Sequence, residues 1–208
     1  MGSLYKKNVI ATALNEVGYQ AEGNGKVNKY AAELDSVDFF TGCGNKQGLD
    51  WCCVFVCWCV YKNTEPDPDV WDAHYFLYQS DSCDMAAVVK YAADYFKQNN
   101  AFDTDSKYAC TGDQIFFRNE SGLSHTGLVV DWDDKGIYTV EGNTNGGKVA
   151  KKFYSYGDPK IAGFGHPRYD QEPADSAPAP APKKNIYVDI SAPDDCEVIV
   201  NVNKHIEG

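Results

Sequence analysis

The sequence predicts an α+β domain in which helices come first and an antiparallel β-sheet follows. In the first half of the chain, apolar residues recur at helical spacing. In the second half, short β-branched and aromatic segments are separated by turn sequences such as Asp-Asp-Lys-Gly and Asn-Thr-Asn-Gly-Gly. Helices followed by strands, without alternation, are typical of the α+β class. An apolar fraction of 43% over 208 residues is enough for a packed core.

Four segments have the pattern of helices. The first ends near Gly18, a residue that often follows a helix. The last is amphipathic, stops at Asn99 and Asn100, and has an expected inner face formed by Ala87, Val88, Tyr91, Ala92 and Tyr95. The predicted helices are residues 9–17, 28–34, 51–61 and 84–98.

Five segments then have the pattern of strands, each short and rich in β-branched or aromatic residues. The turns between them are short, which favours antiparallel neighbours. The predicted strands are residues 113–117, 125–131, 137–141, 148–154 and 161–166.

Composition divides the chain into three parts. We expect a main domain at residues 4–169. Residues 170–184 contain an alternating Pro-Ala run and predict a semi-rigid linker. Residues 185–208 contain two β-rich runs and are too few to fold alone, so they predict a docking hairpin or the start of a truncated further domain.

The charge of the chain restricts its partners. A formal net charge of -11 repels phosphate backbones and anionic lipid, so we expect neither nucleic acid nor a membrane as partner. The longest apolar run, residues 52–61, is too short to span a bilayer. No apolar stretch of signal-peptide length follows the first eight residues, so no signal peptide is expected. We expect a monomer that is made in the cytoplasm.

Eight cysteines are present, and four of them crowd into one predicted helix. Without a signal peptide, free and mostly buried thiols are expected rather than disulfides. A zinc site is not favoured, because the chain has no Cys-x-x-Cys pair and its four histidines are scattered. We therefore expect no metal and no cofactor.

One of these cysteines has the position of a nucleophile. Cys52 falls where a helix begins, after the turn-prone Gly48 and a possible N-cap at Asp50. A free thiol has a pKa of about 8.5, and a helix N-terminus or a nearby histidine lowers the pKa. Packing in the core is the alternative for each of the four clustered cysteines.

A matching base lies on the predicted sheet. His125 opens one strand, and the next strand ends with Glu141-Gly142-Asn143. If the two strands form a hairpin around the turn at residues 133–136, His125 comes to face Thr144, within a residue or two. Glu141 or Asn143 then reaches the imidazole, as a third polar group must in a cysteine hydrolase.

Five short motifs together resemble the CHAP family, the cysteine/histidine-dependent amidohydrolase-peptidases of phage endolysins and bacterial autolysins. They occur in that family's order and cover most of residues 4–169. They are Trp-Cys-x-x-Phe-Val at 51–56, Gly-Asp-Gln-Ile-Phe-Phe at 112–117, His-Thr-Gly-Leu-Val at 125–129, Glu-Gly-Asn at 141–143 and Gly-Phe-Gly-His-Pro at 163–167.

The resemblance implies a papain-like fold and a catalytic site for cutting amide bonds in bacterial peptidoglycan. It implies that Cys52 is the nucleophile, His125 the base, Glu141 the residue that orients the imidazole, and Asn143 a further polar member. Cys53 departs from the family pattern, which often has a small residue there. Some relatives bind calcium, but no Asp-x-Asp-x-Asp-Gly loop is present here, so no required metal is expected.

Aromatic side chains suit a groove that holds sugars or extended peptides, and we expect Trp51, Trp71 and His74 to contribute to substrate binding. Packing is the alternative for His74. An NlpC-type stem-peptide endopeptidase ranks second as a function, because its third residue is usually a second histidine. A non-catalytic wall-binding module is the alternative from another class, and an antibacterial toxin a further one. The resemblance leaves open which amide bond is cut, N-acetylmuramoyl-L-alanine or a peptide bond.

Overall fold

The computed structural model describes residues 1–80 and 84–171. Residues 1–172 form one compact unit. The predicted tail at residues 185–208 and nearly all of the predicted linker lie outside the described residues. The helices are α1 (Lys6–Asn15), α2 (Lys29–Ser36), α3 (Cys52–Tyr61), α4 (Val70–Phe76) and α5 (Val89–Gln98), with a 3-10 turn at Ser106–Tyr108.

Six antiparallel strands form the main sheet, in the order β3-β8-β4-β5-β6-β7. They are β3 (Phe102–Asp103), β4 (Gln114–Asn119), β5 (Gly122–Trp132), β6 (Gly136–Thr144), β7 (Lys148–Ser155) and β8 (Ile161–Gly165). A small second sheet pairs β1 (Ser3–Leu4) with β2 (Thr64–Glu65). The α+β prediction, with helices packed on an antiparallel sheet, is confirmed.

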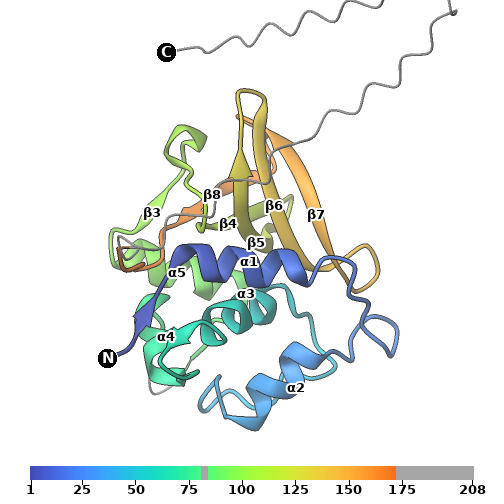
Figure 1. Ribbon diagram of the computed structural model, residues 1–208. Coiled ribbons are helices and arrows are strands. Elements are labelled where there is room, and N and C mark those ends of the chain that lie inside the picture. Colours follow the sequence, from blue (N-terminus) through green and yellow to red (C-terminus); the bar gives the residue numbers. More distant parts are fainter. Residues whose placement is uncertain (81–83, 172–208) are drawn as a thin grey trace, which may run out of the picture. The chain divides into compact units, whose positions relative to one another are not determined.

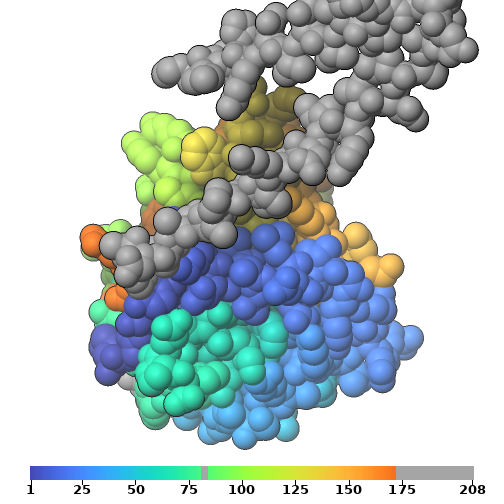
Figure 2. Space-filling view, in the orientation of Figure 1, coloured from blue at the N-terminus to red at the C-terminus, as the bar shows by residue number. Residues whose placement is uncertain are grey.

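Helix α3 is the centre of the core. All ten of its residues are buried, because it packs against β5 and β6 on one side and against α1, α2 and α4 on others. A helix that is apolar all round is stable only when neighbours enclose it. Figure 1 shows α1 and α3 beside the sheet. In the space-filling view, atoms of the first 80 residues, coloured blue to teal, cover the lower part of the domain (Figure 2).

The sheet buries residues on both faces. Alternate residues such as Phe116, Leu128 and Val140 join the helix-side core. Their neighbours, including Ile115 and Val129, belong to a second apolar cluster. Since successive side chains of a strand point to opposite faces, the two clusters lie on opposite faces of the sheet.

The predicted helix at residues 84–98 begins later than expected. Val88 has an extended backbone (φ -102°, ψ 123°) and precedes the first helical residue. The Asp84 carboxylate accepts a hydrogen bond from the Ala86 N–H and so holds residues 84–86 in a turn. The predicted inner face was right for Ala92, and Ala87 and Tyr95 pack partly buried against the core, but Val88 and Tyr91 are exposed. The fully buried face is formed by Val89, Ala92, Ala93 and Phe96.

The hairpin register differs from the prediction by one residue. A bulge between Val129 and Asp131 inserts one extra residue in β5, and beyond it Leu128 faces Val140. The regular pairing ends at Leu128 and Val140, and beyond it Gly127 lies against Glu141, since a Cβ at residue 127 would be 2.6 Å from Cγ and 3.3 Å from Cα of Glu141.

Candidate active site

Cys52 is the first residue of α3, with its side chain 5% exposed. Free N–H groups and the helix dipole make a helix N-terminus favourable for a negative charge. Trp51 anchors this end, because its indole Nε1 donates a 2.8 Å hydrogen bond to the carbonyl of Gly25. Gly142 allows strand β6 to approach α3 closely, since a Cβ at residue 142 would lie 2.5 Å from Phe55 and 2.8 Å from Trp51.

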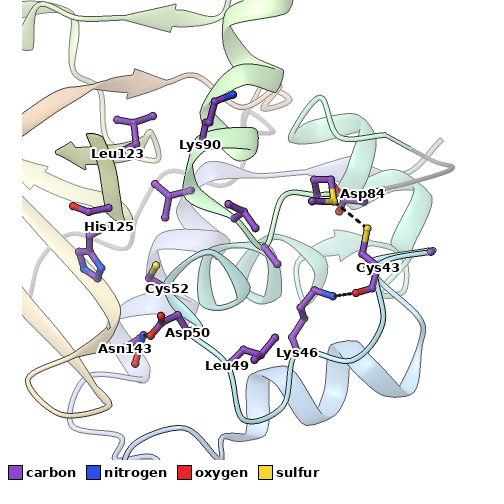
Figure 3. Close-up of a pocket in the computed structure, with 16 residues that line it drawn as sticks. Cys43, Lys46, Leu49, Asp50, Cys52, Asp84, Lys90, Leu123, His125 and Asn143 are labelled. Carbon is purple, nitrogen blue, oxygen red and sulfur yellow. Dashed lines mark hydrogen bonds between the residues drawn. The ribbon is translucent and has the colours of Figure 1, made fainter. Parts of the chain in front are cut away.

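His125 lies in β5 opposite Phe117 in β4, and the two rings stack with centroids 5.8 Å apart. Its Nε2 atom lies 2.9 Å from Oε2 of Glu141. Nδ1 is therefore the ring nitrogen left for Cys52. Figure 3 shows the Cys52 sulfur and the His125 ring at one end of the same cleft.

Glu141 is completely buried, and both carboxylate oxygens have partners. The Thr139 hydroxyl donates to Oε1 at 2.7 Å. Oε2 accepts from His125 and also lies 3.2 Å from Nζ of Lys152. Gly127 provides the room for this carboxylate, because a Cβ there would come within 2.6 Å of Cγ of Glu141.

The surroundings of Cys52 favour the thiolate. The neighbouring thiol of Cys53 lowers the pKa of Cys52 most, burial opposes this, and the hydrogen bond and charge of His125 lower it further, to about 5. The pKa of the Cys53 thiol changes in the opposite direction, because its bond to Cys52 and its burial raise it. Of the adjacent pair, Cys52 is the residue that ionises.

The charge of His125 complements that of Cys52. Burial would lower the pKa of His125, but the bonds to Cys52 and Glu141 outweigh it and raise the pKa to about 9. Burial would likewise raise the pKa of Glu141, but the bonds from His125 and Thr139 and the nearby positive charges lower it. At neutral pH these shifts favour a thiolate beside an imidazolium and a carboxylate.

Asn143 lines the same cleft but does not bind His125. Its Nδ2 donates a 2.9 Å hydrogen bond to Oδ1 of Asp50, which also pairs with Lys26. The Asn143 backbone has φ 55°, a left-handed conformation that Asn tolerates better than most residues. The predicted N-cap role of Asp50 is wrong, because α3 has no side-chain cap and Asp50 bonds instead to the end of β6.

The cleft has a volume of about 890 Å³. Its walls carry the exposed apolar side chains of Leu49 and Val88, together with Leu123 of β5. Lys46 and Asp84 lie farther along it, away from His125 (Figure 3).

Two of the three predicted substrate-binding residues are buried, so the structure corrects that prediction. Trp51 is 0% exposed and packs under Gly142, where it has no surface for a ligand. His74 is also 0% exposed, with Nε2 2.9 Å from the carbonyl of Phe39 and 3.6 Å from the carboxylate of Asp84. Packing, the alternative for His74, is what the structure shows.

Trp71 is exposed, but it does not line the cleft of Cys52. It lies at the start of α4 and borders a separate hollow of about 520 Å³ with Tyr75 and Arg168. The structure thus brings together Cys52, His125, Glu141 and Asn143, and leaves Trp51, Trp71 and His74 outside that group.

Other predicted features can be placed within residues 1–80 and 84–171. Cys52, Cys53, Cys57 and Cys59 are buried and form no disulfide. No group of three His, Cys, Asp or Glu side chains in these ranges is arranged to hold a metal ion. No helix in the described part of the chain has the length and apolar character needed to cross a membrane.

Three residues at the site were missed from the sequence. Thr139 and Lys152 both bind Glu141, and Lys26 pairs with Asp50. The contact between Thr139 and Glu141 could have been predicted from strand alternation, because residues two apart in a strand share a face.

Residues 44–143 match the family model of the CHAP domain. The matched span includes Cys52, His125, Glu141 and Asn143. Comparisons with curated proteins and with solved structures give no match. The order of the motifs, the antiparallel α+β fold and this match agree that the chain contains a CHAP domain, a domain of peptidoglycan amidases and peptidases.

Proposed function

We propose that this protein is a cysteine hydrolase that cuts an amide bond of bacterial peptidoglycan, with Cys52 as nucleophile and His125 as acid and base. The observation that carries the proposal is the contact series from Cys52 through His125 to the buried carboxylate of Glu141, at the end of an open cleft. A nucleophile, a base and an orienting group in series are what acyl transfer by a thiol requires.

In the first half of the reaction, the Cys52 thiolate attacks the carbonyl carbon of the amide and a C–S bond forms. The negative charge that develops on the carbonyl oxygen is stabilised by N–H groups at the start of α3, worth roughly 10²–10³-fold for each donor. The His125 imidazolium then gives its proton to the nitrogen of the leaving amine. The C–N bond breaks, and an acyl-enzyme remains.

In the second half, His125 is neutral and accepts a proton from water. The resulting hydroxide equivalent attacks the acyl carbon, a C–O bond forms and the C–S bond breaks. The acyl group leaves as a carboxylate product, and the thiolate–imidazolium pair is restored. Acid–base help of this kind typically contributes about 10²–10⁴-fold.

Glu141 and Asn143 have supporting roles in this proposal. Glu141 holds Nε2 of His125, which keeps Nδ1 directed at the sulfur and stabilises the imidazolium. Asn143 joins β6 to Asp50, which lies two residues before Cys52, and so holds the helix start against the sheet. Neither residue exchanges a covalent bond with substrate.

The bond that is cut is either the N-acetylmuramoyl-L-alanine amide or a peptide bond of the stem or cross-bridge. Acting on the wall as a monomer, the protein would serve host lysis or wall remodelling. The apolar walls formed by Leu49, Val88 and Leu123 are compatible with alanine side chains near the cut.

The test compares Cys52→Ala with Cys59→Ala. Cys59 is a fully buried thiol of the same helix that does not line the cleft, so its substitution controls for loss of a core sulfur. Purified proteins are incubated with bacterial walls, and turbidity and soluble fragments are followed. We expect no release by Cys52→Ala and near-normal release by Cys59→Ala.

Mass spectrometry of the fragments identifies the bond. An amidase frees intact stem peptides with a new L-Ala amine, whereas an endopeptidase splits stems or bridges. Release of fragments by Cys52→Ala at the rate of the unmodified protein would reject the proposed nucleophile.

A further inference from the structure

A second positive charge lies on the carboxylate that holds His125. Oε2 of Glu141 is 2.9 Å from Nε2 of His125 and 3.2 Å from Nζ of Lys152. The Glu141 side chain is 0% exposed and that of Lys152 is 30% exposed. A buried carboxylate is stable only when its oxygens are well paired, so both cations contribute to keeping it ionised.

The pairing of β6 with β7 places this lysine. Lys152 faces Thr139, and Thr139 and Glu141 are alternate residues of one strand. Lys152 and Glu141 are therefore diagonal neighbours on one face of the sheet, a separation that a long side chain spans. Lys151 is the adjacent residue and points to the other face, where its Nζ lies 5.1 Å from the ring centroid of Tyr138.

The charges around the proposed reacting pair balance when Lys152 is included. The thiolate of Cys52 and the carboxylate of Glu141 are negative, and the imidazolium of His125 and the ammonium of Lys152 are positive. Without Lys152, the group has one uncompensated negative charge. Other titratable side chains near it are Cys53 from α3, Tyr154 from β7 and, before α3, Asp50.

We propose that Lys152 is a positioning residue that shares Oε2 of Glu141 with His125, and thereby limits how strongly that carboxylate holds the imidazolium proton. The benefit is in the step that breaks the amide. His125 must give its proton to the leaving amine, and an imidazolium bound by an unshared buried carboxylate would give it up less readily. This inference about catalysis rests on the proposed function, but the effect on His125 can be measured without substrate.

The test uses three substitutions. Lys152→Met removes the charge and keeps much of the side-chain length. Lys152→Arg keeps a charge at that position. Lys151→Met removes one charge from the neighbouring residue, on the opposite face, and so controls for net charge and for strand β7.

The first readout is an NMR titration of the His125 imidazole, assigned by comparison with His125→Gln. We expect Lys152→Met to raise the pKa of His125 by about half a unit to one unit, in line with the loss of one nearby positive charge. We expect Lys152→Arg and Lys151→Met to titrate as the unmodified protein does. In a Glu141→Gln background, the effect of Lys152→Met should fall to less than half.

The second readout is wall clearing as a function of pH. Lys152→Met should move the alkaline limb of the profile upward and slow clearing at neutral pH by about threefold to tenfold, a loss of under 1.4 kcal/mol. His125 titrating identically in Lys152→Met and Lys151→Met would overturn the inference. If the His125 shift occurs while the unmodified protein fails to clear any wall, the inference about Lys152 holds and the proposed function is rejected.

Discussion

His125 and Glu141 lie on the neighbouring strands β5 and β6, and their 2.9 Å contact is possible because residue 127 between them is a glycine. Glu141 lies against Gly127 of the neighbouring strand, because a Cβ at residue 127 would be 3.3 Å from the Glu141 Cα. Any side chain at residue 127 would occupy the space of the Glu141 side chain. The position of the imidazole therefore depends on a residue that carries no functional group.

Gly127→Ala should impair activity more than stability. The new methyl would lie 2.6 Å from Cγ of Glu141 and 2.8 Å from the Val140 carbonyl, so the carboxylate must move. A displacement of about 1 Å in a catalytic group lowers rates by as much as 10²-fold. Wall clearing and urea unfolding are measured on the same preparation. Unchanged clearing by a folded variant would show that Glu141 does not need this position.

Glu141→Gln should lower the rate of wall clearing by up to about 10⁴-fold, the loss seen when the carboxylate behind a catalytic histidine becomes an amide. The amide cannot stabilise the imidazolium, so the pKa of His125 should fall from about 9. Activity at several pH values and an NMR titration of His125 check both effects. A variant that clears walls within twofold of the normal rate would remove Glu141 from the mechanism.

Asn143→Gly tests the contribution of the Asn143 amide without adding strain to the backbone. Residue 143 has φ 55°, which glycine adopts without strain, whereas Asn143→Ala adds about 1 kcal/mol of strain. Both variants lose the 2.9 Å bond to Asp50, so we expect about a tenfold loss of activity in each, with lower thermal stability in the alanine variant. Normal clearing by the glycine variant would contradict a role for the Asn143 amide.

The pH profile of wall clearing should be bell-shaped with a broad plateau. Cys52 has its pKa lowered to about 5, so activity should fall below that pH as the thiolate is protonated. His125 has its pKa raised to about 9, so activity should fall above that pH as the imidazolium loses its proton. Initial rates of clearing at constant ionic strength test this. A single limb centred near 8.5, the value of an ordinary thiol, would exclude the ion pair.

His166 provides a prediction about stability alone. Its Nδ1 lies 3.0 Å from Asp113 and its Nε2 3.0 Å from Asp103. The Asp113 bond is the main cause that raises the pKa of His166 to about 8, above its ordinary value of 6.5. A raised pKa stabilises the fold below pH 6.5, and this contribution disappears as the pH rises through 8.

His166→Gln should therefore lower the free energy of unfolding more at pH 6 than at pH 9. Urea unfolding of both proteins at the two pH values measures the difference. An equal loss at both would mean that the ring of His166 matters only for packing.

Much of the fold could be predicted from local pattern. Helix α3 and strands β4 to β8 were found within a few residues, because apolar spacing and turn residues act over short distances along the chain. The two-residue strands β1, β2 and β3 were missed, since segments of that length have no periodicity to detect. The start of α5 was misplaced because the turn that delays it depends on a side-chain bond from Asp84.

Residue patterns alone were enough to predict helices before strands, the CHAP motifs and Cys52, His125, Glu141 and Asn143 as candidates. Which of their atoms come into contact depends on how the elements pack. A single bulge between Val129 and Asp131 changed the register by one residue, and packing buried Trp51 and His74. The carboxylate partner Lys152 comes from a separate strand, so its role depends on pairing between β6 and β7. Local residue preferences specify strands and helices, but side-chain contacts between distant segments are set by how those elements pack together.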